Sequence, residues 1–478
     1  MLSTPAARKT DFIAPQPMLP GGVRLHPDIF REYDIRGVVD ETFSPQDAYD
    51  IARAFASRAA ASMPPIICVG RDGRLSSPAL HEAVCQGITD SGFDVLDIGV
   101  GPTPMLYYAT YVSAAAGGIM VTGSHNPPTH NGLKFVLQNR AFYGEDIRSL
   151  REIAWNRAFT SGDAEGKCET VDIREDYIRT LLKCYKGGAL NVAWDAGNGA
   201  TGDVMSVLCH KLPGQHMALH AMIDGHFPAH HPDPTVPENL RELIAAVTGH
   251  RLDAGIAFDG DGDRLGVVDD EGEILWGDQL MMLYAAEILK EHPGCTIIAD
   301  VKASNALFEE VTRLGGTPLM WKTGHSLIKS KMAETGALFA GEMSGHMFFA
   351  DHYFGYDDAL YAALRLLDLL SRSGRKLSEL RRALPKRVST PEIRFDCADH
   401  RKFAVIDEVK GRLRDAACDF HEVDGVRVNT PDGWWLLRAS NTQAMLVARC
   451  EAHDAPGLSR VREALHAQLA SSRIAAPA

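Results

Sequence analysis

Three aspartates, Asp259, Asp261 and Asp263, alternate with glycines near the middle of the chain and are followed by Arg264. Carboxylates this close together repel one another and raise each other's pKa unless a cation compensates. Oxygen ligands of this kind suit Mg²⁺, which takes a few carboxylates and completes its shell with water and phosphate. An EF-hand loop is excluded, because its sixth position is glycine and here that position is Arg264. A solvated acidic turn is the alternative, and the spacing favours a magnesium-binding loop.

A serine in a second polar loop could carry a phosphoryl group. Ser124 follows the apolar run 118–121 and lies in the sequence Thr-Gly-Ser-His-Asn-Pro-Pro. A positioned hydroxyl can act as a nucleophile or phosphoryl carrier, although an isolated serine is more often a turn or N-cap residue. Beside a divalent cation, a phosphate on Ser124 would form a phosphotransfer centre. His125 could assist a bound ligand without being the activating base.

Basic residues elsewhere could stabilise the oxygens of a transferring phosphoryl group. The candidates are Arg36 near the start of the chain, the segment 71–74 with two arginines, and Lys134 ten residues after Ser124. Each alone is more often a solvated surface charge, so the prediction depends on their convergence.

Two later loops have the composition of a sugar-phosphate site. Hydroxyls, an amide and a forked guanidinium suit a phosphate dianion, and such groups follow an apolar strand at Arg438, Ser440, Asn441 and Thr442. The loop 341–346 is rich in glycine, and its side chains could exchange hydrogen bonds with sugar hydroxyls; they are Glu342, Ser344 and His346. Lys302 and His325 come from the same region and could address the substrate phosphate or the rim of the site.

The segment 197–202 matches the glycine pattern of dinucleotide-binding loops, G-x-G-x-x-G. It follows a predicted strand, precedes a plausible helix, and has Asp224 at 22 residues after the last glycine. A dinucleotide-dependent oxidoreductase is therefore one alternative function. That function leaves Ser124, the aspartates and Arg438 unexplained, and the same glycines also serve tight strand-to-helix packing.

The segment 226–234 is rich in histidine and proline and raises the question of a zinc site. Its proline density, and the lack of further ligands nearby in the sequence, favour a structured connecting loop instead.

Short apolar runs alternate with helical patterns over the first 380 residues, which predicts α/β modules. Strands are expected at 65–70, 93–98, 118–121, 190–194, 254–258, 296–299 and 338–340. Three of them end in the polar loops that begin at Thr122, Asp259 and Gly341. Ligands of open parallel sheets bind beyond the carboxyl ends of strands, so three modules could bring these loops over one cleft.

The last 90 residues change character and predict a smaller α+β domain. Strand-like runs at 391–395, 424–428, 434–438 and 444–449 surround a hairpin signal at 430–433, and a helix is expected from Gly457. Upstream of this domain, Asp357 is expected to cap a helix whose leucines at 360, 364, 367 and 370 share one face.

Composition limits the class of protein. The 478 residues are 45% hydrophobic and 23% charged, and the net charge of −13 argues against nucleic acid and membranes as partners. No apolar run approaches the ~18 residues of a membrane-spanning helix. The nine scattered cysteines indicate a reducing compartment, and residues 1–25 lack an apolar signal-peptide core and read as a flexible tail. A cytoplasmic protein is expected.

These motifs occur in the order found in the α-D-phosphohexomutases, which the chain resembles from about residue 26 to its end. The segments that carry the resemblance are 30–37, 122–128, 259–264, 341–346 and 438–442. Their form is most similar to the bacterial phosphomannomutase/phosphoglucomutase branch. The resemblance implies three related α/β modules with mixed sheets and a smaller α+β domain around one central cleft. The domain limits we expect are 1–25 for the tail, then 26–170, 171–275, 276–387 and 388–478.

The resemblance also implies specific roles. Ser124 corresponds to the active-site phosphoserine, and its phosphate completes a Mg²⁺ shell formed by Asp259, Asp261 and Asp263. The residues expected around the transferring group are Arg36, His125, Lys134 and Arg264, with Arg36 and Lys134 as candidate acid–base groups. The residues expected to bind substrate are Tyr33, Lys302, His325, Glu342, Ser344, His346, Arg438, Ser440, Asn441 and Thr442.

The expected activity is interconversion of hexose 1-phosphate and hexose 6-phosphate, of mannose and glucose, with hexose 1,6-bisphosphate as intermediate and activator. Met343 between Glu342 and Ser344 favours this branch over phosphoglucosamine mutases, which tend to have glutamine there; that enzyme remains the nearest alternative. A non-catalytic sugar-phosphate-binding module is a third possibility. The expected partners are small phosphosugars, and the protein is expected to be a monomer or a weak oligomer.

Overall fold

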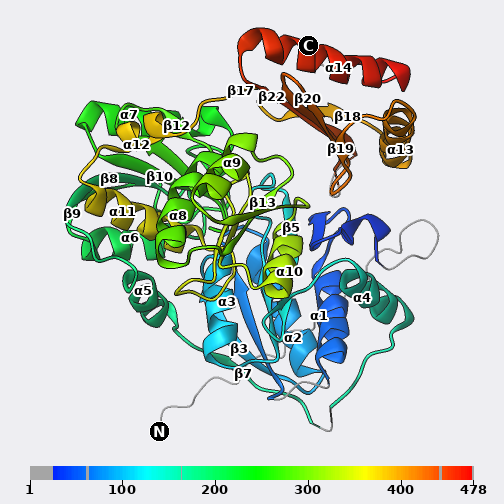
Figure 1. Ribbon diagram of the computed structural model, residues 1–478. Coiled ribbons are helices and arrows are strands. Elements are labelled where there is room, and N and C mark those ends of the chain that lie inside the picture. Colours follow the sequence, from blue (N-terminus) through cyan, green and yellow to red (C-terminus); the bar gives the residue numbers. More distant parts are fainter. Residues whose placement is uncertain (1–24, 61–63, 163, 441–443, 476–478) are drawn as a thin grey trace, which may run out of the picture.

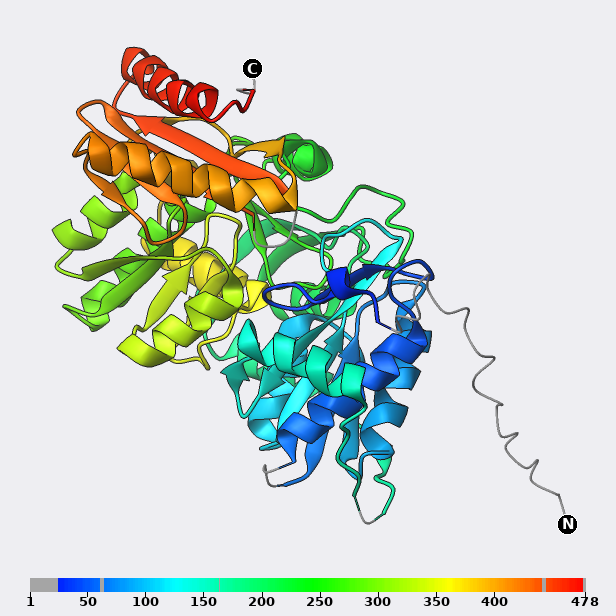
Figure 2. The same cartoon turned by 90° about the vertical axis from the view of Figure 1, so that its right-hand side faces the viewer.

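The computed structural model describes residues 25–60, 64–162, 164–440 and 444–475. Four β-sheets with their helices form four modules, which follow one another along the chain (Figure 1). Module 1 extends from η1 to β7, module 2 from α5 to β12, module 3 from α8 to α12 and module 4 from β17 to α14. Figures 1 and 2 both show module 4, in orange and red, at one end of the molecule.

Module 1 is built on a mixed sheet of order β1-β5-β4-β2-β3-β7, with β6 paired to β5. Its first long helix begins after Ser44, which caps it in a capping box with Asp47, and has proline at its first position. The elements are η1 (Pro27–Ile29), β1 (Ile35–Val38), α1 (Pro45–Ala59), β2 (Ile66–Arg71), α2 (Ser77–Thr89), β3 (Asp94–Val100), α3 (Thr103–Val112), β4 (Gly117–Val121), β5 (His130–Leu137), β6 (Arg140–Ala141), α4 (Glu145–Asn156) and β7 (Cys168–Thr170).

Module 2 has a five-stranded sheet of order β12-β11-β10-β8-β9. Strands β8, β9 and β10 are parallel, whereas β11 and β12 run antiparallel to their neighbours. The elements are α5 (Arg174–Leu182), β8 (Leu190–Asp195), α6 (Gly202–Lys211), β9 (Gly214–Leu219), η2 (Pro237–Leu240), α7 (Arg241–His250), β10 (Ala254–Phe258), β11 (Leu265–Asp269) and β12 (Ile274–Leu275).

Module 3 has a four-stranded sheet of order β14-β13-β15-β16, in which only β16 is antiparallel to its neighbour. The elements are α8 (Gly277–Glu291), β13 (Thr296–Asp300), α9 (Asn305–Arg313), β14 (Thr317–Trp321), α10 (His325–Thr335), β15 (Phe339–Gly341), β16 (Met347–Phe349), α11 (Ala359–Ser373) and α12 (Leu377–Ala383).

The cap of helix α11 differs by one residue from the sequence prediction. Asp358, not Asp357, accepts a hydrogen bond from the amide of Tyr361 at 2.9 Å and is the N-cap. The predicted leucine face is buried, but the other faces are largely buried too, because α11 packs inside the molecule. Asp357 instead makes contacts at the cavity described below.

Module 4 is an antiparallel sheet of order β17-β22-β21-β20-β19, with β18 also paired to β22. The predicted hairpin is confirmed, because Thr430 pairs with Gly433 across the turn between β20 and β21. The elements are β17 (Val388–Ser389), β18 (Ile393–Asp396), α13 (Asp399–Asp415), β19 (Phe420–His421), β20 (Val426–Thr430), β21 (Gly433–Ala439), β22 (Met445–Ala452) and α14 (Ala455–Ser471).

The first three modules repeat one connection. In each, a parallel strand ends in a polar loop and the chain returns in an antiparallel strand: β4 to β5, β10 to β11, and β15 to β16. The three loops are 122–129, 259–264 and 342–346; the first two begin where the sequence predicted, and the third begins one residue later, because Gly341 belongs to β15. The fold therefore presents three equivalent strand ends to one place.

The apolar core explains how the modules are held together. One continuous cluster of buried side chains runs through modules 1, 2 and 3, whereas module 4 has a core of its own.

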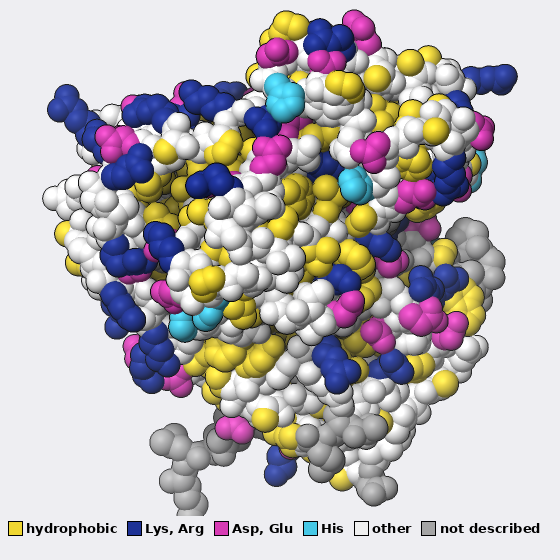
Figure 3. Space-filling view, viewed as in Figure 1, with side chains coloured by type: hydrophobic (Ala, Val, Ile, Leu, Met, Phe, Trp, Pro, Cys, Tyr) yellow, Lys and Arg dark blue, Asp and Glu magenta, His cyan; other side chains and the backbone are white. Residues whose placement is uncertain are grey.

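Basic and acidic side chains are interspersed over the face shown in Figure 3. None of the helices in the described ranges combines the length and the apolar character that crossing a membrane requires.

Candidate active site

A cavity of about 640 Å³ lies where the four modules meet. Each module contributes lining residues, so the cleft predicted from the sequence is confirmed. The predicted site residues that line it are Tyr33, Arg36, Ser124, His125, Lys134, Arg264, Lys302, His325, Glu342, Ser344, His346, Arg438 and Ser440. Asn441 and Thr442 lie outside the described residues.

Ser124 lies at the end of β4 in a backbone conformation that is uncommon for residues other than glycine, with φ of 49°. Its hydroxyl donates a hydrogen bond to Asp259 Oδ2 at 2.9 Å and lies 3.1 Å from His125 Nδ1. Burial and the charges of Arg264 and Arg36 lower the pKa of His125 well below its ordinary value. The ring beside Ser124 is therefore a neutral imidazole and a weak proton acceptor.

The segment 71–74 supports the Ser124 loop from behind and does not line the cavity. The Arg74 guanidinium is buried and donates to four carbonyl oxygens of residues 124–130, including that of Ser124 at 2.7 Å. Asp72 accepts from Thr122 Oγ1 at 2.8 Å and from the Gly123 amide at 3.1 Å. The interpretation of this segment as a source of phosphoryl-binding cations is therefore wrong, because neither of its two arginines lines the cavity and Arg74 fixes the loop conformation.

The aspartate loop meets the Ser124 loop directly. A Cβ on Gly260 would lie 2.3 Å from the Ser124 carbonyl oxygen, so only glycine permits this approach. The loop also contacts module 1 through Thr103, whose hydroxyl donates to Asp261 Oδ2 at 2.5 Å. Nothing in the sequence around Thr103 indicates this contact.

The carboxylates of Asp259, Asp261 and Asp263 are fully buried and have oxygens within 4.8 Å of one another. Asp261 Oδ1 and Asp263 Oδ1 have no hydrogen-bond partner among the described residues. Burial and the neighbouring carboxylates raise the pKa of Asp259 well above its ordinary value. Buried, converging and partly unpaired oxygens are a donor set that fits a hard divalent cation.

Lys134 supplies positive charge to the same carboxylates. Its Nζ lies 2.7 Å from Asp261 Oδ2 and also contacts Asp263 Oδ2. Burial alone would lower the pKa of Lys134, but the two carboxylates raise it above its ordinary value. Burial alone would raise the pKa of Asp261, and the Lys134 ammonium lowers it instead. Lys134 is therefore a fixed cation in this arrangement.

Arg36 is held at the cavity by two contacts. Its Nε donates to Asp34 Oδ2 and its Nη1 to the Gly123 carbonyl oxygen, both at 2.7 Å. Burial opposes its charge, but Asp34 raises the pKa of Arg36 above its ordinary value. The guanidinium is thereby oriented against the Ser124 loop.

The loop of module 3 is joined to the aspartate loop by His346. Arg264 Nε donates to His346 Nε2 at 3.0 Å, and the backbones of the two residues form a β-bridge. On its other side, His346 Nδ1 lies 3.1 Å from Asp357 Oδ2. Asp357 also contacts Lys329 at 2.9 Å and His325 at 3.6 Å. Sequence reasoning assigned Asp357 to a helix cap and missed this position beneath the cavity.

A second cationic group lies at the module 4 side of the cavity. Lys302 Nζ is 3.1 Å from Glu392 Oε2, and Arg438 Nε donates to Asp424 Oδ2 at 2.8 Å. Burial opposes both charges, but Glu392 raises the pKa of Lys302 and Asp424 that of Arg438. Glu392 and Arg394 also line the cavity. Sequence reasoning missed both, because the segment 391–395 was predicted only as a strand and contains no recognisable motif.

Met343 does not line the cavity with its neighbours Glu342 and Ser344. Its sulfur contacts Arg449 of module 4, and its amide donates to Asp300 Oδ1 at 3.1 Å. Any influence of Met343 on specificity must therefore act through the placement of the loop and of module 4.

The glycine-rich segment 197–202 is not available to a dinucleotide. Its amides are hydrogen-bonded within the protein: Gly197 to the Asp195 carboxylate, Asn198 to the His220 carbonyl, Gly199 to the Ala196 carbonyl and Ala200 to the Gly260 carbonyl. A pyrophosphate needs free amides at such a loop. The segment instead packs against the aspartate loop.

Comparison with known proteins agrees with this geometry. Four models of phosphoglucomutase/phosphomannomutase match successive parts of the chain: alpha/beta/alpha domain I at residues 27–160, domain II at 175–272, domain III at 276–388 and the C-terminal domain at 392–468. The chain belongs to the phosphoglucomutase/phosphomannomutase family.

Individual relatives cover almost the whole chain. A phosphomannomutase/phosphoglucomutase of Pseudomonas aeruginosa is 45% identical over 446 residues, which are 93% of this chain and 96% of the relative. A phosphoglucomutase of Neisseria gonorrhoeae is 43% identical over 93% of this chain and 97% of its own. The crystal structure of a phosphoglucomutase/phosphomannomutase family protein from Burkholderia thailandensis superimposes with a TM-score of 0.89 at 41% identity, and covers 95% of this chain and 99% of that one.

Proposed function

We propose that this chain is a phosphohexomutase that interconverts the 1-phosphates and 6-phosphates of glucose and mannose through phosphoserine at Ser124. The observation that carries the proposal is that one cavity holds both the Ser124 hydroxyl, bonded to Asp259, and a second cationic group at Lys302 and Arg438. A hexose 1,6-bisphosphate has two phosphates and needs a site for each. The name of the Pseudomonas aeruginosa relative, phosphomannomutase/phosphoglucomutase, supports this pair of sugars.

In the first half-reaction, phospho-Ser124 transfers its phosphoryl group to O6 of a hexose 1-phosphate. The bond from phosphorus to Oγ breaks and the bond to O6 forms, while O6 loses its proton and Oγ takes one up, so that the serine hydroxyl is restored. The bisphosphate then turns over in the cavity, and its 1-phosphate returns to Ser124. Arg36, Arg264 and the ammonium of Lys134 offset charge on the transferring oxygens, where positioning and electrostatics do most of the catalysis.

Proton transfer has two candidate groups. Arg36 and Lys134 are the candidates from the sequence, and contacts with carboxylates keep both protonated. Each can therefore stabilise negative charge on the transferring phosphoryl group. Either would give up a proton only after another cation had neutralised its carboxylate partners. His125 lies 3.1 Å from Ser124 Oγ, and its lowered pKa makes the neutral ring a hydrogen-bonding partner for the serine or a bound phosphoryl group and not the activating base.

Asp259, Asp261 and Asp263 would hold a divalent cation, for which Mg²⁺ is the hard oxygen-seeking candidate, and the ion would add positive charge at the transferring phosphoryl group. The fit to the residues present is good, because two buried oxygens have no hydrogen-bond partner among the described residues. Lys134 already neutralises part of the same charge and would share the carboxylates with the ion.

Glu342 and Ser344 are proposed to hold O3 and O4 of the sugar in either orientation. Glu342 accepts a hydrogen bond from the Gly324 amide at 2.5 Å, which fixes its carboxylate at the cavity wall. Mannose and glucose share O3 and O4 and differ at O2, so a site that does not read O2 accepts both. Module 4, with its own core, is suited to move and admit substrate.

Asn441 and Thr442 extend the phosphate-binding group, and the domain limits stay at residues 26–170, 171–275, 276–387 and 388–478. The protein acts as a monomer or a weak oligomer on small phosphosugars.

The test is an assay of Mg²⁺-dependent isomerisation of glucose 1-phosphate, mannose 1-phosphate and glucosamine 1-phosphate, each with a trace of hexose 1,6-bisphosphate. We expect comparable turnover of the first two, and Ser124→Ala to lower it by at least about 10³-fold because the phosphoryl carrier is lost. Ser113→Ala, at the end of α3 and outside the cavity lining, is the matched control and should keep wild-type turnover.

Other outcomes separate the alternatives. A preference for glucosamine 1-phosphate would keep the mechanism and identify a phosphoglucosamine mutase. Binding of phosphosugars with no turnover, and near-normal activity of Ser124→Ala, would each contradict the proposal, the first in favour of a non-catalytic binding module.

A further inference from the structure

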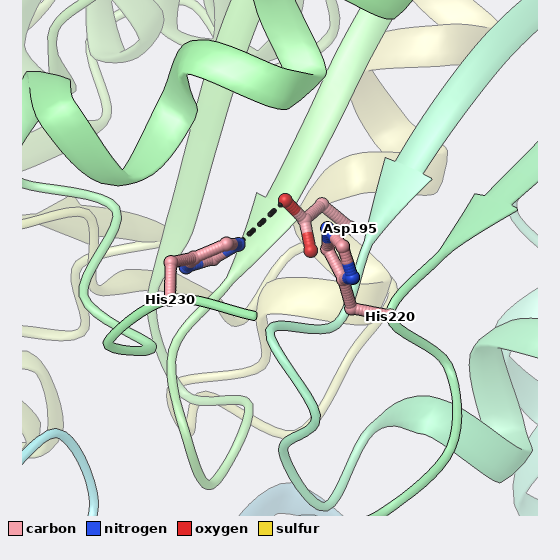
Figure 4. Close-up of side chains that lie close together, drawn as sticks. All are labelled: Asp195, His220 and His230. Carbon is pink, nitrogen blue, oxygen red and sulfur yellow. Dashed lines mark hydrogen bonds and ion pairs between the residues drawn. The ribbon is translucent and has the colours of Figure 1, made fainter. Parts of the chain in front are cut away.

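Outside the active cavity, module 2 brings together a carboxylate and two imidazoles from three separate segments. Asp195 ends β8, His220 directly follows β9, and His230 lies in the histidine-rich loop (Figure 4). One ligand atom from each lies within 4.8 Å of the others. The sequence showed no further metal ligand close to the histidine-rich loop. The fold brings two such residues to it, Asp195 and His220.

The topology explains why these residues meet. Strands β8 and β9 are parallel neighbours, and Asp195 pairs with Leu219, the residue before His220. Their carboxyl ends therefore place Asp195 and His220 side by side at one sheet edge, the edge where open parallel sheets bind ligands. The loop folds back across this edge, and His230 Nε2 lies 2.9 Å from Asp195 Oδ2 (Figure 4).

The outer atoms of the cluster are held in the manner of metal-binding histidines. His230 Nδ1 lies 3.0 Å from the His231 carbonyl oxygen, which leaves Nε2 directed at Asp195. His220 Nε2 lies 3.0 Å from a carboxylate oxygen of Glu242 on α7. Carbonyl and carboxylate partners of this kind fix ring orientation and raise ligand basicity. Asp195 is fully buried, and its Oδ1 accepts from the Gly197 amide at 2.8 Å, so its carboxylate is rigid.

We propose that Asp195, His220 and His230 form a binding site for a Zn²⁺-class transition-metal ion, separate from the aspartate loop of the active cavity. Two imidazoles and one carboxylate suit Zn²⁺ and its neighbours in the first transition row, whereas Mg²⁺ prefers oxygen alone. Tetrahedral zinc holds its ligand atoms about 3.3 Å apart. The ligand atoms lie within 4.8 Å of one another here, so metal binding would draw them together by up to about 1.5 Å.

The site would fasten the histidine-rich loop to the sheet at a point next to the active cavity. His231 and Asp233, which directly follow His230, line that cavity. Pro232 lies against both Gly197 and Gly260, whose loops belong to the two sites. A bound ion would stabilise the folded state by mass action and restrain one wall of the cavity.

His220 distinguishes this proposal from a simpler use of the same contact. An ion pair between protonated His230 and Asp195 needs only those two residues, and removal of His220 would leave it intact. A metal site needs all three. The rings of His220 and His230 meet edge to face, at 87° with centroids 5.3 Å apart, so loss of His220 removes a ring contact of His230 but not its bond to Asp195.

The experiment is calorimetric titration of metal-free, full-length protein with Zn²⁺, together with zinc-edge X-ray absorption of the loaded protein. His220→Ala is the informative variant, because its side chain is only partly buried, outside the apolar core of module 2, and its loss should not prevent folding. His226→Ala is the matched control, since His226 lies in the same loop, is exposed and bonds only to Asp224 among the contacts resolved for its side chain.

We expect one Zn²⁺ equivalent with nitrogen ligands in wild type and in His226→Ala. Even the loss of an outer partner weakens metal affinity about 10–100-fold, so His220→Ala should lose at least about 100-fold at this equivalent. A second equivalent with oxygen ligands only would belong to the aspartate loop and should persist in both variants. Equal nitrogen-ligated binding in wild type and His220→Ala, or oxygen ligands alone in wild type, would overturn the proposal.

Discussion

At the residue scale, the charge balance of the aspartate loop depends on Lys134. The ammonium contacts Asp261 and Asp263, and both carboxylates are fully buried. Removing one partner of a buried ion pair is far more costly than removing the whole pair, because an uncompensated charge remains. The residue is therefore expected to matter for folding as well as for phosphoryl transfer.

Lys134→Met should lower the free energy of unfolding by about 3–5 kcal/mol when divalent cations are chelated. Mg²⁺ should restore most of that loss, because an ion among the three aspartates replaces the missing positive charge. Urea unfolding in EDTA and in excess Mg²⁺ measures both quantities. Lys290→Met, which removes an exposed pair with Glu287, is the control and should change stability by less than about 1 kcal/mol in either condition.

An equal loss with and without Mg²⁺ would show that the ammonium and the ion do not balance the same charge. The geometry predicts otherwise, because Asp261 Oδ1 and Asp263 Oδ1 still lack hydrogen-bond partners among the described residues while Lys134 contacts the Oδ2 atoms.

At the element scale, the repeated connection from a parallel to an antiparallel strand makes the site possible. The three loops must approach one another closely, and two glycines permit this. Gly260 faces the Ser124 carbonyl oxygen, and Gly345, with φ of 97°, faces that of Leu265, where a Cβ would lie 2.5 Å away. A side chain at either position would separate two loops that hold the active residues.

Gly260→Ala should therefore destabilise the protein and lower mutase turnover, because its Cβ would meet backbone that cannot rotate away. Gly249→Ala in α7 is the matched control: a Cβ there meets nothing within 4 Å, and alanine in a helix should raise stability by about 0.5–1 kcal/mol. Thermal unfolding and the isomerisation assay on both variants check the pair. Equal behaviour of the two alanine variants would contradict the close approach of the loops.

Helix α11 gives a pH prediction. Burial raises the pKa of its N-cap, Asp358, to about 6, although Tyr361, Tyr353 and Tyr177 donate hydrogen bonds to the carboxylate. The unfolded value is about 3.9, so the folded protein binds the proton more tightly. The resulting stabilisation is complete below about pH 4 and is lost as pH rises through 6, with an upper limit of about 3 kcal/mol.

Asp358→Asn removes this titration, so its stability should depend less on pH than that of wild type between pH 4 and 6. Urea unfolding at half-unit pH steps measures the difference. Asp454→Asn, which alters the exposed cap of α14, should leave the wild-type dependence unchanged. Parallel curves for wild type and Asp358→Asn would contradict the raised pKa.

At the scale of the whole molecule, module 4 is attached to module 3 by buried polar contacts more than by a shared core. Arg427 is fully buried, stacks on Trp434 at 3.6 Å, and donates to the carbonyl oxygens of Val301 at 2.5 Å and Ala303 at 2.8 Å. Among the described residues, the apolar cluster that joins the two modules is small and consists of Val301, Trp434 and Leu436, with Met320 packed against them. This attachment determines the position of Arg438 relative to the cavity.

Arg427→Met should leave the two carbonyl oxygens without a partner and weaken the attachment by about 1–3 kcal/mol. We expect faster proteolytic cleavage in the connection between α12 and β18, and a higher KM for hexose 1-phosphate with a smaller change in kcat. Arg460→Met on the outer surface of module 4 is the control, because it removes only an exposed pair with Asp432. Unchanged proteolysis and KM in Arg427→Met would show that other contacts hold the module.

The sequence by itself determined the chemistry of the site. The aspartate loop, the serine loop and the loop at Glu342 are local patterns, and each contains the residue types its role requires within a few positions. The strands before them were also predictable, because a buried strand is a short apolar run. The polar strand ends therefore follow from local patterns in the chain, whereas their convergence on one cleft was an expectation from the strand-end rule and the family resemblance that the structure confirms.

Only the tertiary structure decided which residues share an environment. Arg36 and Arg74 look alike in sequence, yet one lines the cavity and the other holds a loop from behind. Asp357 and Asp358 are adjacent, and a one-residue difference in where α11 begins gives the first to the cavity and the second to the cap. Asp195 and His220 meet His230 only because two parallel strands end together. The physical reason is that ion pairing, burial and pKa depend on distances across the fold, which no local spacing in the chain specifies.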